Sequence, residues 1–218
     1  MTFLLHSHWR AAAPYRVRLG LELKGLAYDY AGVNLADGEQ HKAPYRAVNA
    51  QRLTPALDIG EGQILTQSLA ILEWLEETHP DPPLLPREPL HRQRVRAMAG
   101  IVACDIHPLN NLRVLRALSA AGLAADVRQT WIVRWITDGF KALEPMIIAH
   151  GDGFSFGDAP TIADCCLIPQ IYSANRLGVD ISEFPSILGV GERAAAHPAF
   201  MAAHPDRQPD APADRSTA

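Results

Sequence analysis

The chain has 218 residues, 48% of them hydrophobic, and a formal net charge of −4 at pH 7. A chain of this length buries about 70% of the surface that it exposes when unfolded, which is enough for one large domain or two small ones. The sequence pI of about 6.1 argues against a nucleic-acid-binding domain, which is normally basic. The mean hydropathy is −0.05, and no apolar run approaches the roughly 20 residues of a membrane-spanning helix.

The first part of the chain contains short apolar segments separated by turn residues. Met1–His8 lacks the basic and long apolar regions of a secretory signal, so we expect no export signal there. Four short segments are typical of strands, and the last two flank a hairpin turn at Gly60–Gly62: Phe3–Leu5, Tyr28–Leu35, Ala56–Ile59 and Gln63–Leu65.

The segment Arg16–Lys24 is ambiguous. Its Val and Leu residues alternate with other residues, and this period of two indicates a strand. Pro14, however, suits the first turn of a helix, and Gly25 suits the end of one. Leu, Glu and Lys also favour a helix, so the local sequence leaves the choice open.

A proline-rich stretch separates this part from a helical second part. Five of the ten residues from Pro80 to Pro89 are proline, which indicates a stiff, extended connector. Beyond it, apolar residues recur at helical spacing in two sets: Val95, Met98, Ala99, Val102 and Ile106, and then Ile132, Trp135, Ile136, Phe140, Leu143 and Ile147. We therefore predict a first domain at residues 1–82, a linker at 83–90, a helical domain at 91–204 and a disordered tail at 205–218.

Two local signals stand out in the helical part. Thr161–Asp164 matches a variant capping box, in which the threonine hydroxyl accepts the amide of the third helical residue and Asp164 reaches back to the N-cap. The helix that it opens should run from Ile162 towards Asn175. Pro108 should interrupt another helix, because it has no N–H to donate to the carbonyl of Cys104.

The cysteines indicate the compartment. Cys104, Cys165 and Cys166 cannot all pair with one another, and their spacing is not that of a metal site. We expect a reduced, cytoplasmic protein without a bound metal.

Seven stretches together form a distinctive set: Tyr15–Leu19, Leu23–Gly25, Leu53–Leu57, Thr66–Glu77, Asp105–Arg113, Thr161–Asp164 and Ile168–Gln170. Their sequences and order resemble the zeta class of glutathione transferases, which contains maleylacetoacetate and maleylpyruvate isomerases. The resemblance covers nearly the whole chain apart from the tail. It implies an α/β N-terminal thioredoxin-like domain plus an all-α C-terminal domain, glutathione as the cofactor, and a homodimer.

The resemblance assigns glutathione contacts in the first domain. Gln67 and Ser68 begin an apolar helix, where a hydroxyl and free amides can bind the γ-glutamyl carboxylate; the alternative is that Ser68 is only a helix cap. Most X–Pro bonds are trans, but the family's equivalent of Pro55 is cis and turns the backbone of Thr54 towards the cysteinyl amide. Gln40 lies where the family contacts the glycyl end.

The resemblance also assigns residues to the substrate and to the helical domain. The equivalents of His107 and Asn111 lie against the cofactor, although the local sequence also fits polar surface residues beside a kink. Arg176 matches an arginine that anchors a substrate carboxylate, and Arg10 matches the arginine before the catalytic turn. Two guanidinium groups suit a dicarboxylate, unless they are simply solvated. A third arginine of some maleylpyruvate isomerases is replaced here by Leu112.

The sequence departs from the family at the catalytic turn. Zeta-class proteins carry Ser-Ser-Cys, or Ser with a nearby Thr or Cys, directly after the arginine, whereas this chain has Ala11, Ala12 and Ala13. No hydroxyl or thiol remains there to donate to the glutathione sulfur. Backbone amides at a helix N-terminus could hold the thiolate instead, with Arg10, Tyr15 or His8 as other sources of a donor or of charge.

The resemblance implies a glutathione-dependent cis–trans isomerase of a maleyl keto acid in the breakdown of aromatic compounds. In such a reaction a thiolate adds to a cis alkene, the resulting single bond rotates, and elimination leaves the trans product. One alternative is a transferase, lyase or dehalogenase acting on another unsaturated or aromatic acid. The other is a non-catalytic glutathione-binding protein, which the alanine turn makes credible. Neither nucleic acid nor a membrane is an expected partner.

Overall fold

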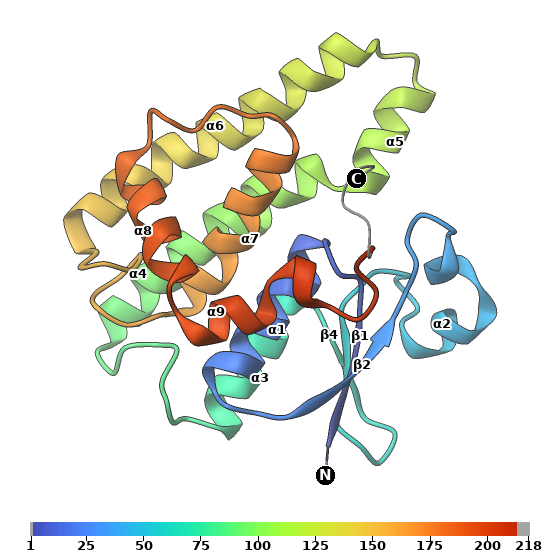
Figure 1. Cartoon of the computed structure of the whole chain (residues 1–218), viewed down its shortest axis with the longest axis horizontal. Coiled ribbons are helices and arrows are strands. Elements are labelled where there is room, and N and C mark those ends of the chain that lie inside the picture. Colours follow the sequence, from blue (N-terminus) through green and yellow to red (C-terminus); the bar gives the residue numbers. More distant parts are fainter. Residues whose placement is uncertain (1, 213–218) are drawn as a thin grey trace. The chain divides into compact units, whose positions relative to one another are not determined.

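The computed structural model describes residues 2–212. It divides into two compact units, Met1–Pro83 together with His197–Ala218, and Leu84–Ala196. The elements of both units are labelled in Figure 1.

The first unit is an α/β unit. In chain order its elements are β1 (Phe3–Ser7), α1 (Ala12–Leu23), β2 (Tyr28–Gly32), η1 (Glu39–His41), α2 (Ala43–Val48), β3 (Ala56–Asp58), β4 (Ile64–Thr66), α3 (Ser68–Thr78), α9 (Pro198–Ala203) and η4 (Pro205–Arg207). The strands form a sheet of order β2-β1-β3-β4. β1 is parallel to β2 and antiparallel to β3, and β3 and β4 form the expected hairpin.

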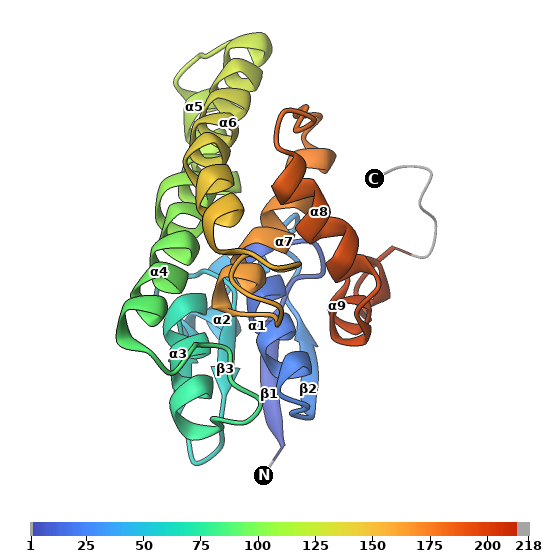
Figure 2. The ribbon, with the colours of Figure 1, turned by 90° about the vertical axis from the view of Figure 1, so that its left-hand side faces the viewer.

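The ambiguous segment Arg16–Lys24 is helical and belongs mostly to α1. Val17 and Leu21 lie in one buried core with side chains of β1, β3 and α3, and α1 and α3 pack side by side (Figure 2). Because α1 also packs against α9, it is buried on more than one side, and Leu19 is fully buried as well. A helix buried on several sides loses the single apolar stripe that identifies an amphipathic helix.

The second unit is helical. Its elements are α4 (Pro89–Gly100), the π-helix η2 (Ile101–Ile106), η3 (His107–Asn110), α5 (Leu112–Ala120), α6 (Ala125–His150), α7 (Ile162–Arg176) and α8 (Pro185–Ala195). The predicted apolar faces are largely buried, with α4 packed on α7 and α6 on α8. Within residues 2–212, no helix is long and apolar enough to cross a membrane.

Both local signals of the helical part are confirmed. The Thr161 hydroxyl accepts the Ala163 amide at 3.2 Å, and Asp164 Oδ2 accepts the Thr161 amide at 2.7 Å, which completes the capping box. At Pro108 the regular α-helix has already given way to the π-helix η2 and the 3₁₀-helix η3.

The expectation of a disordered tail is wrong for residues 205–212. Pro205 opens η4, and Gln208 and Asp210 make hydrogen bonds within the first unit. Residues 197–204 likewise belong to the first unit rather than to the helical one. The composition wrongly predicted disorder for residues 205–212, because polar contacts rather than apolar burial fix most of this segment. Residues 213–218 of the predicted tail lie outside the described residues.

Candidate functional site

The N-terminus of α3 is built differently from the sequence expectation. Gln67 is the N-cap, with φ at 68°, and Ser68 is the first helical residue. Ser68 is buried, and its Oγ accepts a hydrogen bond from Arg16 Nη1 at 3.3 Å. The interpretation of Ser68 as a helix cap is therefore wrong, because its hydroxyl lies one residue inside the helix and contacts a buried guanidinium.

The same helix end can stabilise an anion. The amides of the first turn of a helix have no intrahelical acceptor, and the helix dipole makes this end positive. A positive φ is uncommon for a residue other than glycine and is typical of functional turns. The Gln67 side chain points to Gln51, whose Oε1 accepts from its Nε2 at 2.7 Å.

The loop before β3 contains the expected cis peptide bond between Thr54 and Pro55. The Leu53 carbonyl accepts the Tyr45 hydroxyl at 2.6 Å and the Asn49 side-chain amide at 2.7 Å, so the loop is tied to α2. Ala56, directly after the cis bond, pairs with Thr66 at the end of β4. The Thr54 main chain and the start of α3 are therefore close to each other in the first unit.

Gln40 lies in η1 and is 7% exposed. Its Oε1 atom is buried and has no hydrogen-bond partner among residues 2–212. A buried amide oxygen without a donor is costly, so this atom marks a place where a ligand N–H or a water would be stabilised.

The alanine turn leads into α1. Ala11 is the N-cap and makes no side-chain cap bond, and its amide donates to the His8 carbonyl at 3.1 Å. The first turn of α1 carries no acidic residue, so the positive end of the helix is not neutralised there. Arg10 lies with its Cζ atom 5.3 Å from the centre of the Trp9 ring.

The two other candidate donors near this turn are buried. Burial lowers the pKa of the His8 imidazole below its ordinary value, and the nearby Asp210 carboxylate offsets this only in part. The shift therefore favours the neutral imidazole. The Tyr15 ring is 2% exposed and packs edge-on against His204. Neither side chain is an exposed replacement for the missing hydroxyl.

The candidate residues of the helical unit have their own local contacts. Asn111 is the N-cap of α5, and its Oδ1 accepts the Arg113 amide at 3.1 Å. His107 begins η3 and is half-buried, whereas Arg176 ends α7 and is exposed. The capping role of Asn111 was not predicted, although Asn directly before an apolar helical run is a standard N-cap signal.

Sequence reasoning missed Arg16 and Asp210. Arginine and aspartate are mostly exposed in proteins, so nothing local distinguishes them from surface residues. Arg16 is 2% exposed and bonds to Ser68, and Asp210 bonds to the turn before α1.

An α/β unit with a cis-proline loop and a buried serine opening α3, continued by an all-helical unit, defines a protein of the glutathione transferase class. The family model "Glutathione S-transferase, N-terminal domain" matches residues 13–78. The maleylacetoacetate isomerase of Pseudomonas aeruginosa is 48% identical over 96% of this chain and 99% of its own length. The maleylpyruvate isomerase of a Ralstonia species is 45% identical over 94% of this chain and 98% of its own length.

Solved structures show similarity to the same two kinds of isomerase. A holo structure of a maleylpyruvate isomerase, described as a bacterial zeta-class glutathione S-transferase, has a TM-score of 0.93 and 44% identity, covering 96% of this chain and 100% of that one. The maleylacetoacetate isomerase of Anaeromyxobacter dehalogenans with bound glutathione has a TM-score of 0.89 and 46% identity, covering 97% of this chain and 98% of that one. The chain belongs to the zeta-class glutathione transferase family of maleylacetoacetate and maleylpyruvate isomerases.

Proposed function

We propose that this protein is a glutathione-dependent isomerase that converts a cis maleyl keto acid, of the maleylacetoacetate or maleylpyruvate type, to its trans isomer. One observation carries the proposal: the likeness to isomerases of both types extends over almost the full length of both partners, at 48% and 45% identity. The first unit supports it with backbone and side-chain groups suited to a γ-glutamyl peptide.

Three segments of the first unit carry groups that suit different parts of glutathione. The first amides of α3, the Ser68 hydroxyl and the charge of buried Arg16 suit the γ-glutamyl carboxylate. The main chain of Thr54 suits the cysteinyl amide, and Gln40 suits the glycyl end, where its unpartnered Oε1 can accept an N–H. The residues present therefore fit glutathione.

The alanine turn would act through its main chain. Glutathione, when bound, supplies a thiolate that adds to the alkene and leaves after rotation about the single bond. The amides at the start of α1 and the helix dipole stabilise negative charge at that position. Arg10 adds positive charge and can bind a substrate carboxylate through two parallel hydrogen bonds.

In the helical unit, Arg176 is the proposed anchor for the second substrate carboxylate, and His107 and Asn111 are proposed cofactor contacts. We further propose a cytoplasmic homodimer that serves the breakdown of aromatic compounds. The alanine turn specifically favours one competing function, a glutathione-binding protein without turnover. A transferase or lyase acting on another unsaturated acid would keep the same glutathione site.

The test measures the isomerisation of maleylacetone by absorbance, with glutathione, without it, and with S-methylglutathione, which has no free thiol. We expect turnover with glutathione alone. Tight binding of glutathione without turnover would favour the non-catalytic function. Stable addition of glutathione to an unsaturated acid, without formation of the trans product, would favour a transferase.

A further inference from the structure

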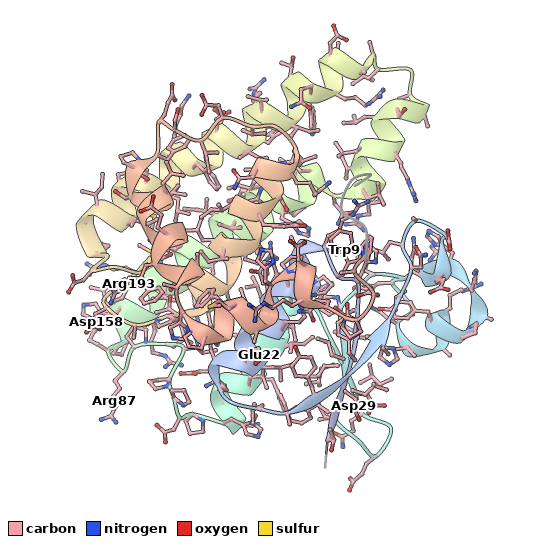
Figure 3. The ribbon with its side chains drawn as sticks, viewed as in Figure 1. Trp9, Glu22, Asp29, Arg87, Asp158 and Arg193 are labelled. Carbon is pink, nitrogen blue, oxygen red and sulfur yellow. The ribbon has the colours of Figure 1, made fainter. Side chains whose placement is uncertain are left out.

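The segment after α9 lies against the turn that precedes α1. The Gln208 side-chain amide donates to the carbonyls of Ala202 and His204 at 3.1 and 2.9 Å, which closes this segment into a compact loop. The loop brings Asp210 to the turn after β1, where its carboxylate accepts the amide of Trp9. Trp9 is labelled in Figure 3. A Cβ at Gly32 of β2 would lie 3.3 Å from the Asp210 Cβ, so the segment approaches β2 closely.

The Asp210 carboxylate binds two elements at once. Its Oδ1 accepts the Tyr30 hydroxyl of β2 at 2.6 Å, and its Oδ2 accepts the Trp9 amide at 3.1 Å. The same Oδ2 lies 3.7 Å from His8 Nδ1. Hydrogen bonds to an ionised acceptor are about twice as strong as neutral ones, so this one carboxylate ties the turn to the sheet.

Arg18 binds the carbonyl side of Trp9, the residue whose amide Asp210 binds. Its Nη2 donates to the Trp9 carbonyl at 2.8 Å, while its Nη1 and Nε donate to Ser7 Oγ and the Ala203 carbonyl, both at 3.1 Å. The N–H of Trp9 is thus bound by the C-terminal segment and its C=O by α1. Both peptide groups that flank Trp9 are fixed by charged side chains.

This anchoring matters because the alanine turn begins directly after Trp9. Arg10 is the next residue and lies over the Trp9 ring, and the Ala11 amide is bound by the His8 carbonyl. Ala11–Ala13 have no hydroxyl or thiol. Within this turn, Arg10 and the backbone amides are therefore the groups that can act on a bound sulfur, and the effect of these amides depends on where the backbone lies.

We propose that Asp210 is a positioning residue, which fixes the turn from His8 to Ala13 so that Arg10 and the first amides of α1 meet a bound thiol in one geometry. The proposal rests on the proposed function, which places the glutathione thiol at this turn. Small displacements of a reacting geometry cost up to about 100-fold in rate, so loss of the anchor should lower turnover more than binding.

The charged groups that face His8 provide a second readout. Asp210 raises the pKa of the imidazole, whereas Arg10 and Arg18 lower it, in addition to the lowering by burial. Replacing Asp210 by a neutral residue therefore lowers the His8 pKa further. This shift is measured by NMR titration and does not depend on catalysis.

The experiment compares Asp210→Ala and Asp210→Asn with Asp206→Ala, which removes an exposed carboxylate from the same segment. For Asp210→Ala we expect kcat to fall about tenfold or more while the glutathione Kd changes less than about threefold. Amide hydrogen exchange over residues 8–13 should accelerate. Asp210→Asn, which keeps an acceptor for the Trp9 amide, should recover part of the rate, and Asp206→Ala should match the wild type.

The proposal is overturned if Asp210→Ala leaves kcat and the exchange of residues 8–13 unchanged, or if Asp206→Ala has the same effects. If Asp210→Ala does not fold, Tyr30→Phe tests the same anchor, because it removes the hydroxyl that holds Asp210 Oδ1. Absence of isomerisation in the wild type would contradict the proposed function but not the positioning role of Asp210. Amide hydrogen exchange over residues 8–13 would then still decide whether Asp210 positions the turn.

Discussion

At the scale of single residues, the alanine turn is the feature that most affects the chemistry. Ala11 is the N-cap of α1 and Ala12 is its first residue. Neither side chain can donate to a bound sulfur, and the Ala11 amide already donates to the His8 carbonyl, so Ala12 offers its main-chain N–H alone. The acidity of a glutathione thiol bound here should therefore reflect backbone amides, the helix dipole and Arg10.

A serine restored in this turn should acidify the bound thiol. One hydrogen bond to a charged group contributes about 1.5–3 kcal/mol, which corresponds to between about one and two pKa units. We expect Ala12→Ser to lower the thiol pKa and raise turnover near neutral pH. Ala11→Ser should have a smaller effect, because a hydroxyl at the N-cap is used by the helix itself. Thiolate absorbance followed across pH measures both variants.

A wild-type thiol pKa already well below 7, and unmoved by either serine, would contradict this role of the turn. Another group would then activate the sulfur. Arg10 would be the first residue to test, because His8 and Tyr15 are buried.

At the scale of elements, the start of α3 allows ligand binding to be tested without removing a helix cap, because Ser68 is not the cap. Because Ser68 Oγ contacts Arg16 rather than an amide of its own helix, Ser68→Ala should weaken glutathione binding chiefly through the lost polar contact. We expect the Kd measured by calorimetry to rise about tenfold, the equivalent of about 1.4 kcal/mol.

The variant Ser68→Thr provides the matched comparison, since it keeps a hydroxyl at the same position. It should bind glutathione more tightly than Ser68→Ala. Undiminished binding by Ser68→Ala would show that the γ-glutamyl site lies elsewhere.

The capping box of α7 tests the opposite case, a polar residue with a purely structural role. Asp164 is fully buried and accepts the amides of Thr161 and Ser155, both at 2.7 Å. Asp164→Ala leaves buried donors without an acceptor and should destabilise the fold by about 2 kcal/mol or more. Denaturant unfolding measures the loss, and the glutathione Kd of the folded variant should not change.

Asp180→Ala is the control for this substitution. Asp180 also accepts a nearby amide, that of Ser182 at 2.9 Å, but it is exposed. Its loss should change the stability much less than that of Asp164. A weaker glutathione affinity in Asp164→Ala, without a change in unfolding, would contradict the structural role.

At the scale of the whole molecule, the chain leaves its first unit at Pro83 and returns to it at His197. Composition predicted disorder for the returning segment, yet Asp210 bonds to Trp9 across a sequence separation of 201 residues. Sequence patterns over short windows contain no information about a partner so distant.

The sequence by itself determined the features that depend on near neighbours in the chain. The β3–β4 hairpin, the buried faces of α4 and α6, the capping box at Thr161 and the helix break at Pro108 all follow from interactions within a few residues. The family motifs added the fold and the cis bond before Pro55.

Only the tertiary structure decided the rest. It made α1 a helix by burying it against α3 and α9, placed the Ser68 hydroxyl against Arg16, and bound Trp9 between Asp210 and Arg18. The helix α1 depends on apolar burial between these elements, whereas the other two contacts depend on charge. A buried charge is stable only beside its partners, and these partners come from elements far apart in the sequence that meet only when the chain is folded.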